Sequence, residues 1–203
     1  MFLVRRPSHE TVDRFLRESQ DLPLSYEPVG IVREKSQIAH PKSQMKWDLD
    51  EVTVVLGRGR AHFEKARSAL LSWTHFDLGW VELFPARAPV AVGTVVAVQI
   101  RHLGMWSLNG CRVVYTVGSA NEGDRFGFAY GTLTNHAEAG EELFEVFLDP
   151  RTDEVTYRIR ATSRPRATLA RLGQPIVRAL QARFRRDSGA MMRRGTHAGD
   201  VRR

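Results

Sequence analysis

The chain has 203 residues, of which 42% are apolar and 26% charged, and its formal net charge is +7. This is an ordinary composition for one globular domain, which at this length needs no disulfide or metal to fold. The single cysteine, Cys111, excludes an internal disulfide, and the sequence contains no zinc-ligand cluster, no secretory signal and no apolar run of roughly 20 residues that could span a bilayer. We therefore expect a cytoplasmic protein that needs neither metal nor cofactor.

Residues 1–50 predict a helix followed by an irregular extension. Ser8 can cap a helix whose Val12, Phe15 and Leu16 share one face. Prolines and a glycine interrupt residues 21–30, and residues 31–50 are polar and poorly periodic, so we predict a loop there. Residues 51–57 then predict a strand, and residues 61–73 predict an amphipathic helix with four apolar residues at helical spacing, Phe63, Ala66, Leu70 and Trp73.

From residue 80 the apolar pattern changes to a period of two. Six runs separated by glycine, proline, asparagine and aspartate predict strands within residues 80–84, 94–103, 107–118, 125–135, 141–148 and 154–162. Because no helical segment separates them, they predict an antiparallel meander. A long helical pattern follows, interrupted by Gly173 and Pro175, which predicts a kink. Its apolar positions are Leu169, Leu172, Ile176, Leu180 and Phe184.

This order predicts an α+β fold in which about six or seven antiparallel strands grip a long kinked C-terminal helix. The helix is the one long apolar stripe available to cover the sheet, and a curved sheet around it leaves space for a small apolar ligand. We expect an N-terminal extension over residues 1–50, the domain over residues 51–194 and a basic flexible tail over residues 195–203.

The positive charge lies in the C-terminal quarter. Residues 158–203 hold thirteen arginines against two aspartates, a balance of +11, so residues 1–157 carry −4. Arg171, Arg178 and Arg185 recur every seven residues and predict one helix face. That face is either solvated or a contact for anionic lipid or phosphate, whereas the scarcity of interleaved aromatic residues argues against nucleic acid. Arg58 and Arg60, beside glycines before the first internal helix, form a second candidate anion site.

The stretch FAYGTLTNHAEAGEELFEV, residues 128–146, raises the question of catalysis. With residues 136–140 as a hairpin loop, Thr134 would pair with Glu142 and Tyr130 with Val146. Glu142 and Thr134 would then lie at the rim of the cavity, with His136 just beyond. A carboxylate at an apolar rim would have a raised pKa and could exchange protons with a histidine. The alternative is that Glu142 bonds to its own turn and His136 is solvated. The predicted cavity wall consists of Phe126, Phe128, Tyr130, Phe144, Val146 and Tyr157.

The chain resembles an uncharacterised family shared by bacteria and plants, known as a domain of unknown function. The matching patterns are G-x-G-x-x-x-[FY]-E, G-T-L-x-x-H-x-x-x-G-E-E-x-F and L-G-x-P. They are met by Gly57, Gly59, Phe63, Glu64, Gly131, Thr132, Leu133, His136, Gly140, Glu141, Glu142, Phe144, Leu172, Gly173 and Pro175. The family is similar to helix-grip proteins of the START and polyketide-cyclase type, so the resemblance implies that fold, and it carries no established activity.

Three functional interpretations remain open. The first is a protein that binds a small apolar or amphipathic molecule between the sheet and the last helix. The second is a cofactor-free cyclase, dehydratase or hydrolase that uses His136 and Glu142 as acid and base. The third is a protein that acts at an anionic membrane or nucleic-acid surface through its C-terminal arginines.

Overall fold

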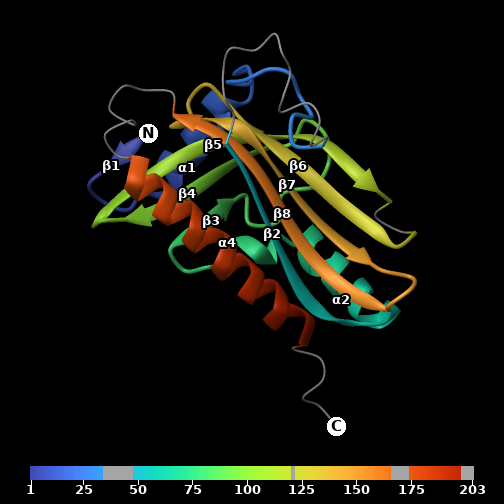
Figure 1. Ribbon diagram of the computed structural model, residues 1–203. Coiled ribbons are helices and arrows are strands. Elements are labelled where there is room, and N and C mark those ends of the chain that lie inside the picture. The colour runs from blue at the N-terminus through green and yellow to red at the C-terminus, as the bar shows by residue number, and fades with distance from the viewer. Residues whose placement is uncertain (34–47, 120–121, 166–173, 198–203) are drawn as a thin grey trace.

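A computed structural model describes residues 1–33, 48–119, 122–165 and 174–197. Figure 1 shows a curled sheet with a long helix across its open side and the N-terminal helix on the other side. The helices are α1 (His9–Ser19), α2 (Arg60–Leu71), the short 3-10 helix η2 (Thr74–Phe76) and α4 (Gln174–His197). The strands are β1 (Phe2–Leu3), β2 (Asp48–Arg58), β3 (Val81–Phe84), β4 (Val95–His102), β5 (Met105–Gly118), β6 (Arg125–Thr132), β7 (Glu138–Leu148) and β8 (Glu154–Pro165).

The sheet is antiparallel, with strand order β2-β8-β7-β6-β5-β4-β3, and the two-residue strand β1 pairs with β5 outside this path. Five consecutive hairpins produce the order from β3 to β8. Strand β2 closes the far edge because it pairs with β8. This confirms the predicted α+β fold, a seven-stranded antiparallel sheet packed against a long C-terminal helix.

The concave face of the sheet holds the main core. Alternate residues of β6, β7 and β8 point toward α2, η2 and α4, as the period of two requires. The predicted apolar face of α2 is confirmed, since Phe63, Ala66 and Leu70 are buried. Gly189 of α4 packs closely against the sheet, since a Cβ there would lie 2.7 Å from Val54 Cγ2.

The convex face is covered by the N-terminal residues. Helix α1, capped by Ser8 as predicted, buries Val12 and Phe15 against β4 and β5. Residues 24–33 pack farther along the same face, where Tyr26, Ile31 and Val32 are buried with Leu143 of β7. The N-terminal segment therefore packs on the same sheet that grips α4.

Several boundaries differ from the predictions by a few residues. Strand β2 begins at Asp48 instead of residue 51, and residues 34–47 of the predicted loop lie outside the described residues. The β6–β7 loop spans residues 133–137 instead of 136–140, so Tyr130 pairs with Glu142 and Phe128 with Phe144. Gly140 belongs to β7 because it lies directly against the backbone of β8, where a Cβ would clash with the Thr162 carbonyl.

The assignment of residues to the two faces is nevertheless correct, because the predicted and observed registers differ by an even number of residues. Helix α4 continues to His197, past the predicted start of the tail at residue 195. The kink was predicted at Gly173 and Pro175. Gly173 lies outside the described residues, and Pro175 stands in the first turn of α4, where its missing N–H costs no hydrogen bond.

Candidate ligand-binding cavity

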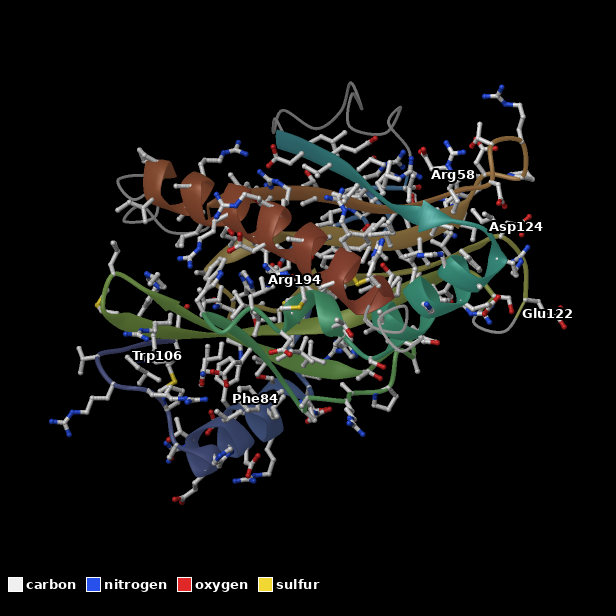
Figure 2. All side chains as sticks on the ribbon, turned by 90° about the horizontal axis from the view of Figure 1, so that it is seen from below. Arg58, Phe84, Trp106, Glu122, Asp124 and Arg194 are labelled. Carbon is white, nitrogen blue, oxygen red and sulfur yellow. The ribbon has the colours of Figure 1, made fainter. Side chains whose placement is uncertain are left out.

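A cavity of about 540 Å³ lies between the concave face of the sheet and the first half of α4. Its walls are mostly apolar side chains from β3, β4 and α4, with a few polar groups from β7 and β8. It occupies the end of the molecule near the β4–β5 hairpin, which Trp106 marks in Figure 2; Arg58 and Asp124 mark the opposite end. The apolar wall is formed by Trp80, Val81, Val98, Ile100, Leu103, Met105, Ile176, Val177, Leu180 and Phe184.

The opposite end of the concave face is solid. The rings of Trp73, His75 and Phe76 fill the space over β6, β7 and β8 there, with His75 and Phe144 centroids 4.6 Å apart. Of the predicted wall residues, only Tyr130 lines the cavity. The other five belong to this packed core, because α2 and η2 cover the half of the sheet on which they lie: Phe126, Phe128, Phe144, Val146 and Tyr157.

Glu142 lies at the polar end of the cavity and accepts a hydrogen bond of 2.7 Å from the Tyr130 hydroxyl. Burial raises the pKa of Glu142 to about 7, although the Tyr130 bond and the charge of Arg185 lower it. Burial and the neighbouring Glu142 carboxylate also raise the pKa of Tyr130 well above its usual range. The pair therefore holds a carboxyl group that titrates near neutral pH inside an apolar cavity.

A second carboxylate, Glu138, lines the same cavity four residues earlier in β7. It accepts hydrogen bonds from Gln181 Nε2 of α4 at 3.0 and 3.2 Å, and from the Ser163 hydroxyl of β8 at 3.4 Å. Burial raises its pKa, while these hydrogen bonds and Arg178 lower it. Glu138 was not predicted as a site residue, although it lies four residues before Glu142 in the same strand, which places both side chains on one face.

His136 lines the cavity together with Glu142, from the loop between β6 and β7. Its Nδ1 accepts a hydrogen bond of 2.9 Å from the backbone N–H of Glu138. Thr134 lies in the same loop and is not among the residues that line the cavity; its backbone N–H donates to the Pro23 carbonyl at 3.1 Å. The candidate acid and base thus face one cavity, with Tyr130 as the partner of Glu142.

The side chain of Glu141, next to Glu142 in β7, lies on the convex face of the sheet. Glu141 is 2% exposed and accepts hydrogen bonds from the hydroxyls of Tyr26 and Tyr115 and from the Gly30 N–H, all at 2.7–2.8 Å. Gly131 leaves room for the Tyr26 ring, since a Cβ there would clash with it. The Gly-Glu-Glu motif therefore combines an anchor for residues 26–32 with a cavity carboxyl.

Three of the candidate anion-binding arginines have partners within the protein. Arg178 and Arg185 both donate to Asp50 Oδ2 of β2 at 3.0 Å, so this face of α4 meets the sheet and is not a solvated outer face. Arg60 is ion-paired with Asp124 and donates to the Gly123 carbonyl at 2.7 Å. Arg58 is exposed at the end of β2, and Arg171 lies outside the described residues.

The glycines beside Arg58 have conformational roles. Gly59 has φ +86° and begins the turn into α2, and Gly57 lies against the His62 ring, where a Cβ would clash. Within the described parts of the chain, no helix is long and apolar enough to cross a membrane, and no group of three or more His, Cys, Asp or Glu residues could hold a metal ion.

Comparison with solved structures places the fold in the helix-grip class. The aromatase/cyclase Zhui from a Streptomyces species superposes with a TM-score of 0.51 at 12% identity, over 77% of this chain and 97% of that protein. A Thermus thermophilus protein superposes with a TM-score of 0.52 at 9% identity, over 76% and 100% of the two chains.

The sequence identifies the family. Residues 25–191 match the domain of unknown function DUF1990. The chain is 33% identical to a UPF0548 protein of Dictyostelium discoideum over 93% of its length and 92% of the relative's. It is 32% identical to a UPF0548 protein of Arabidopsis thaliana over 90% and 91% of the two chains. The protein belongs to the DUF1990/UPF0548 family, as its three sequence patterns indicated.

Proposed function

We propose that this protein binds a small amphipathic molecule in the cavity between the sheet and α4. The observation that carries this proposal is the cavity itself, about 540 Å³ with a mostly apolar wall and a few convergent polar groups at one end. Ligand sites have volumes of roughly 300–1,000 Å³ and this combination of lining groups. The apolar wall would hold the body of the ligand, and Glu142, Glu138 and Tyr130 would bind its polar end.

The fold supports the same proposal by analogy. One structure of similar fold is an aromatase/cyclase. A shared fold at this low identity does not carry an activity across, so the proposal rests on the geometry of the cavity.

Native mass spectrometry of the freshly purified protein tests occupancy, followed by extraction of the bound molecule. We expect a discrete added mass that is lost on denaturation. Ala161→Trp on β8 would place an indole in the cavity, and it should remove the added mass. Ala179→Trp, at an exposed position of α4, is the matched control and should retain it.

A protein that neither carries a ligand nor binds an apolar probe such as decanol would contradict the proposal. Equal ligand binding by Ala161→Trp and Ala179→Trp would also contradict the proposal, because binding would then be independent of the cavity.

A second candidate function is acid–base catalysis on the bound molecule. It is favoured by the pKa of about 7 for Glu142, which suits a group that both gives and takes protons at neutral pH. His136 faces the same cavity. Incubation of the extracted molecule with the protein would then change its mass or its isomer, and Glu142→Gln would abolish the change without abolishing binding.

A further inference from the structure

Five charged side chains meet at the polar end of the cavity. Glu138 and Glu142 of β7 and Arg185 of α4 line the cavity. Asp50 of β2 joins them through its bond to Arg185, and Arg178 of α4 through its bond to Asp50. Both guanidinium groups donate to the same atom, Asp50 Oδ2, at 3.0 Å. The two arginines are therefore held by one carboxylate, and three carboxylates share two positive charges.

Among the described residues, the neighbouring titratable groups add no positive charge. Burial lowers the pKa of His102, which also lines the cavity, and so favours its neutral form. Burial raises the pKa values of Tyr130, Tyr157 and Cys111 well above their usual ranges, so these three groups are neutral. The Nδ1 atom of His136 accepts the Glu138 N–H, so this nitrogen carries no proton in this arrangement. With both cavity glutamates ionised, the five charged side chains described at the polar end carry three negative charges and two positive charges, a balance of −1.

The polar end is also rich in hydrogen-bond acceptors. Among the described residues, Tyr130 is the hydrogen-bond donor to Glu142, and its bond to Oε2 leaves Oε1 for a ligand. Gln181 directs its Nε2 to Glu138, and its Oε1 is buried without a partner among the described residues. A ligand group with a positive charge and several N–H donors would balance the excess negative charge and could donate hydrogen bonds to these acceptor oxygens.

We infer that the cavity takes an amphipathic amine, an apolar body with a protonated amino group, and that Glu142 is the ion-pair partner of this group. The inference rests on the proposed function and specifies the chemical class of its ligand. A carboxylate would add a further negative charge beside Glu138 and Glu142 in a site of low dielectric, so it is excluded.

Three probes with the same ten-carbon chain separate these cases: decylamine, decanol and decanoate. Between pH 6 and pH 8 the amine stays cationic and the carboxylate anionic, while Glu142, with a pKa of about 7, changes from mostly protonated to mostly ionised. Decylamine affinity should therefore rise about tenfold from pH 6 to pH 8, decanol affinity should change little, and decanoate should bind at least tenfold more weakly than decylamine at pH 8.

Calorimetry in buffers of different ionisation enthalpy measures the number of protons released when decylamine binds. Decylamine binding at pH 6 should release nearly one proton from Glu142. Glu142→Gln should abolish both the release and the pH dependence, whereas Glu122→Gln, in the exposed loop at the far end of the sheet in Figure 2, should change neither.

Tyr130→Phe is a second test variant, which should shift the pH dependence of decylamine binding without abolishing it. It removes the hydrogen bond that favours the ionised form of Glu142, so the midpoint of the decylamine pH dependence should move to higher pH.

Decanoate binding as tight as decylamine, or a decylamine affinity that does not depend on pH, would overturn the amine assignment while decanol binding still supported the cavity. If none of the three probes binds, the proposed function fails together with the inference.

Discussion

His75 is a completely buried histidine whose neighbours are aromatic rings. Its centroid lies 4.6 Å from Phe144, 4.7 Å from Phe76 and 5.8 Å from Trp73. Neither ring nitrogen has a hydrogen-bond partner among the described residues. Burial lowers the pKa of His75 to about 3, so the ring is neutral and carries an unpaired donor and acceptor. Such groups cost free energy that a phenyl ring of similar size would not.

We therefore expect His75→Phe to raise the free energy of unfolding at pH 7 by about 1–2 kcal/mol. The mirror substitution Phe76→His, at the neighbouring buried position, should lower it because it adds a second unpaired imidazole. Urea denaturation of the three proteins measures both changes. A loss of stability in His75→Phe would show that the imidazole nitrogens are hydrogen-bonded in solution.

The candidate site could be predicted only in part at the level of single residues. Alternation along β6 and β7 correctly placed Tyr130 and Glu142 on the concave face, and the polar character of Glu142 marked it as unusual there. The same alternation could not show that Phe128 and Phe144 lie under η2, because contact between the sheet and residues 74–76 depends on tertiary packing. Asp50, which fixes two arginines of α4, had no local signal.

Helix α4 has two halves with different contacts. In its second half, Ser188 is hydrogen-bonded to the Tyr157 hydroxyl at 2.9 Å, Gly189 lies against β2 and Met192 is fully buried. The first half lies over the cavity and is fixed to the sheet by the bonds from Arg178 and Arg185 to Asp50. The attachment of the first half of α4 to the sheet therefore depends more on polar contacts than that of the second half.

Asp50→Asn should loosen this first half selectively. Partly exposed ion pairs contribute up to about 1 kcal/mol each, so we expect backbone amides in residues 177–185 to exchange hydrogen severalfold faster, with residues 188–196 unchanged. Hydrogen exchange with mass spectrometry measures this. Asp124→Asn, which removes the partner of Arg60 at the far end of the sheet, is the control. Uniform acceleration along α4 would contradict the division into halves.

The elements themselves could be predicted more fully than their pairing. Each strand from β3 to β8 followed from alternation and turn residues, because those signals are local. The predicted β6–β7 register was off by four residues, since Glu142 lies opposite Tyr130 and not Thr134. Gly140, which the prediction placed in the loop, is in β7, where it allows close contact with β8. The N-terminal contacts of Tyr26 and Gly30 with Glu141 join residues more than 100 positions apart, beyond any local pattern.

The pH dependence of stability belongs to the whole molecule, because two buried groups from different elements act on it in opposite directions. The pKa of His75 is lowered from 6.5 to about 3, so its contribution raises stability as pH rises from 3 to 6.5. The pKa of Glu142 is raised from 4.5 to about 7, so its contribution lowers stability as pH rises from 4.5 to 7. Between pH 4.5 and 6.5 these two contributions cancel.

Single variants should reveal the separate pH dependences of stability that His75 and Glu142 contribute. Relative to wild type, the stability of His75→Phe should fall with rising pH between 4.5 and 6.5, and that of Glu142→Gln should rise, each by up to about 1.4 kcal/mol per pH unit. The double variant should again follow the wild type in this window. Thermal denaturation across the pH range tests all four proteins, and parallel curves for all of them would contradict the two assignments.

Glu141 and Glu142, consecutive in β7, hold opposite sides of the sheet: one secures Tyr26 and Gly30 outside, the other faces the cavity inside. Substitution at either position changes one side alone. A single residue inserted or deleted between Gly140 and Glu145 would instead exchange the two sides, burying the outer anchor in the cavity and turning the cavity carboxyl outward. The number of residues in β7 therefore determines the outer cover and the cavity lining together.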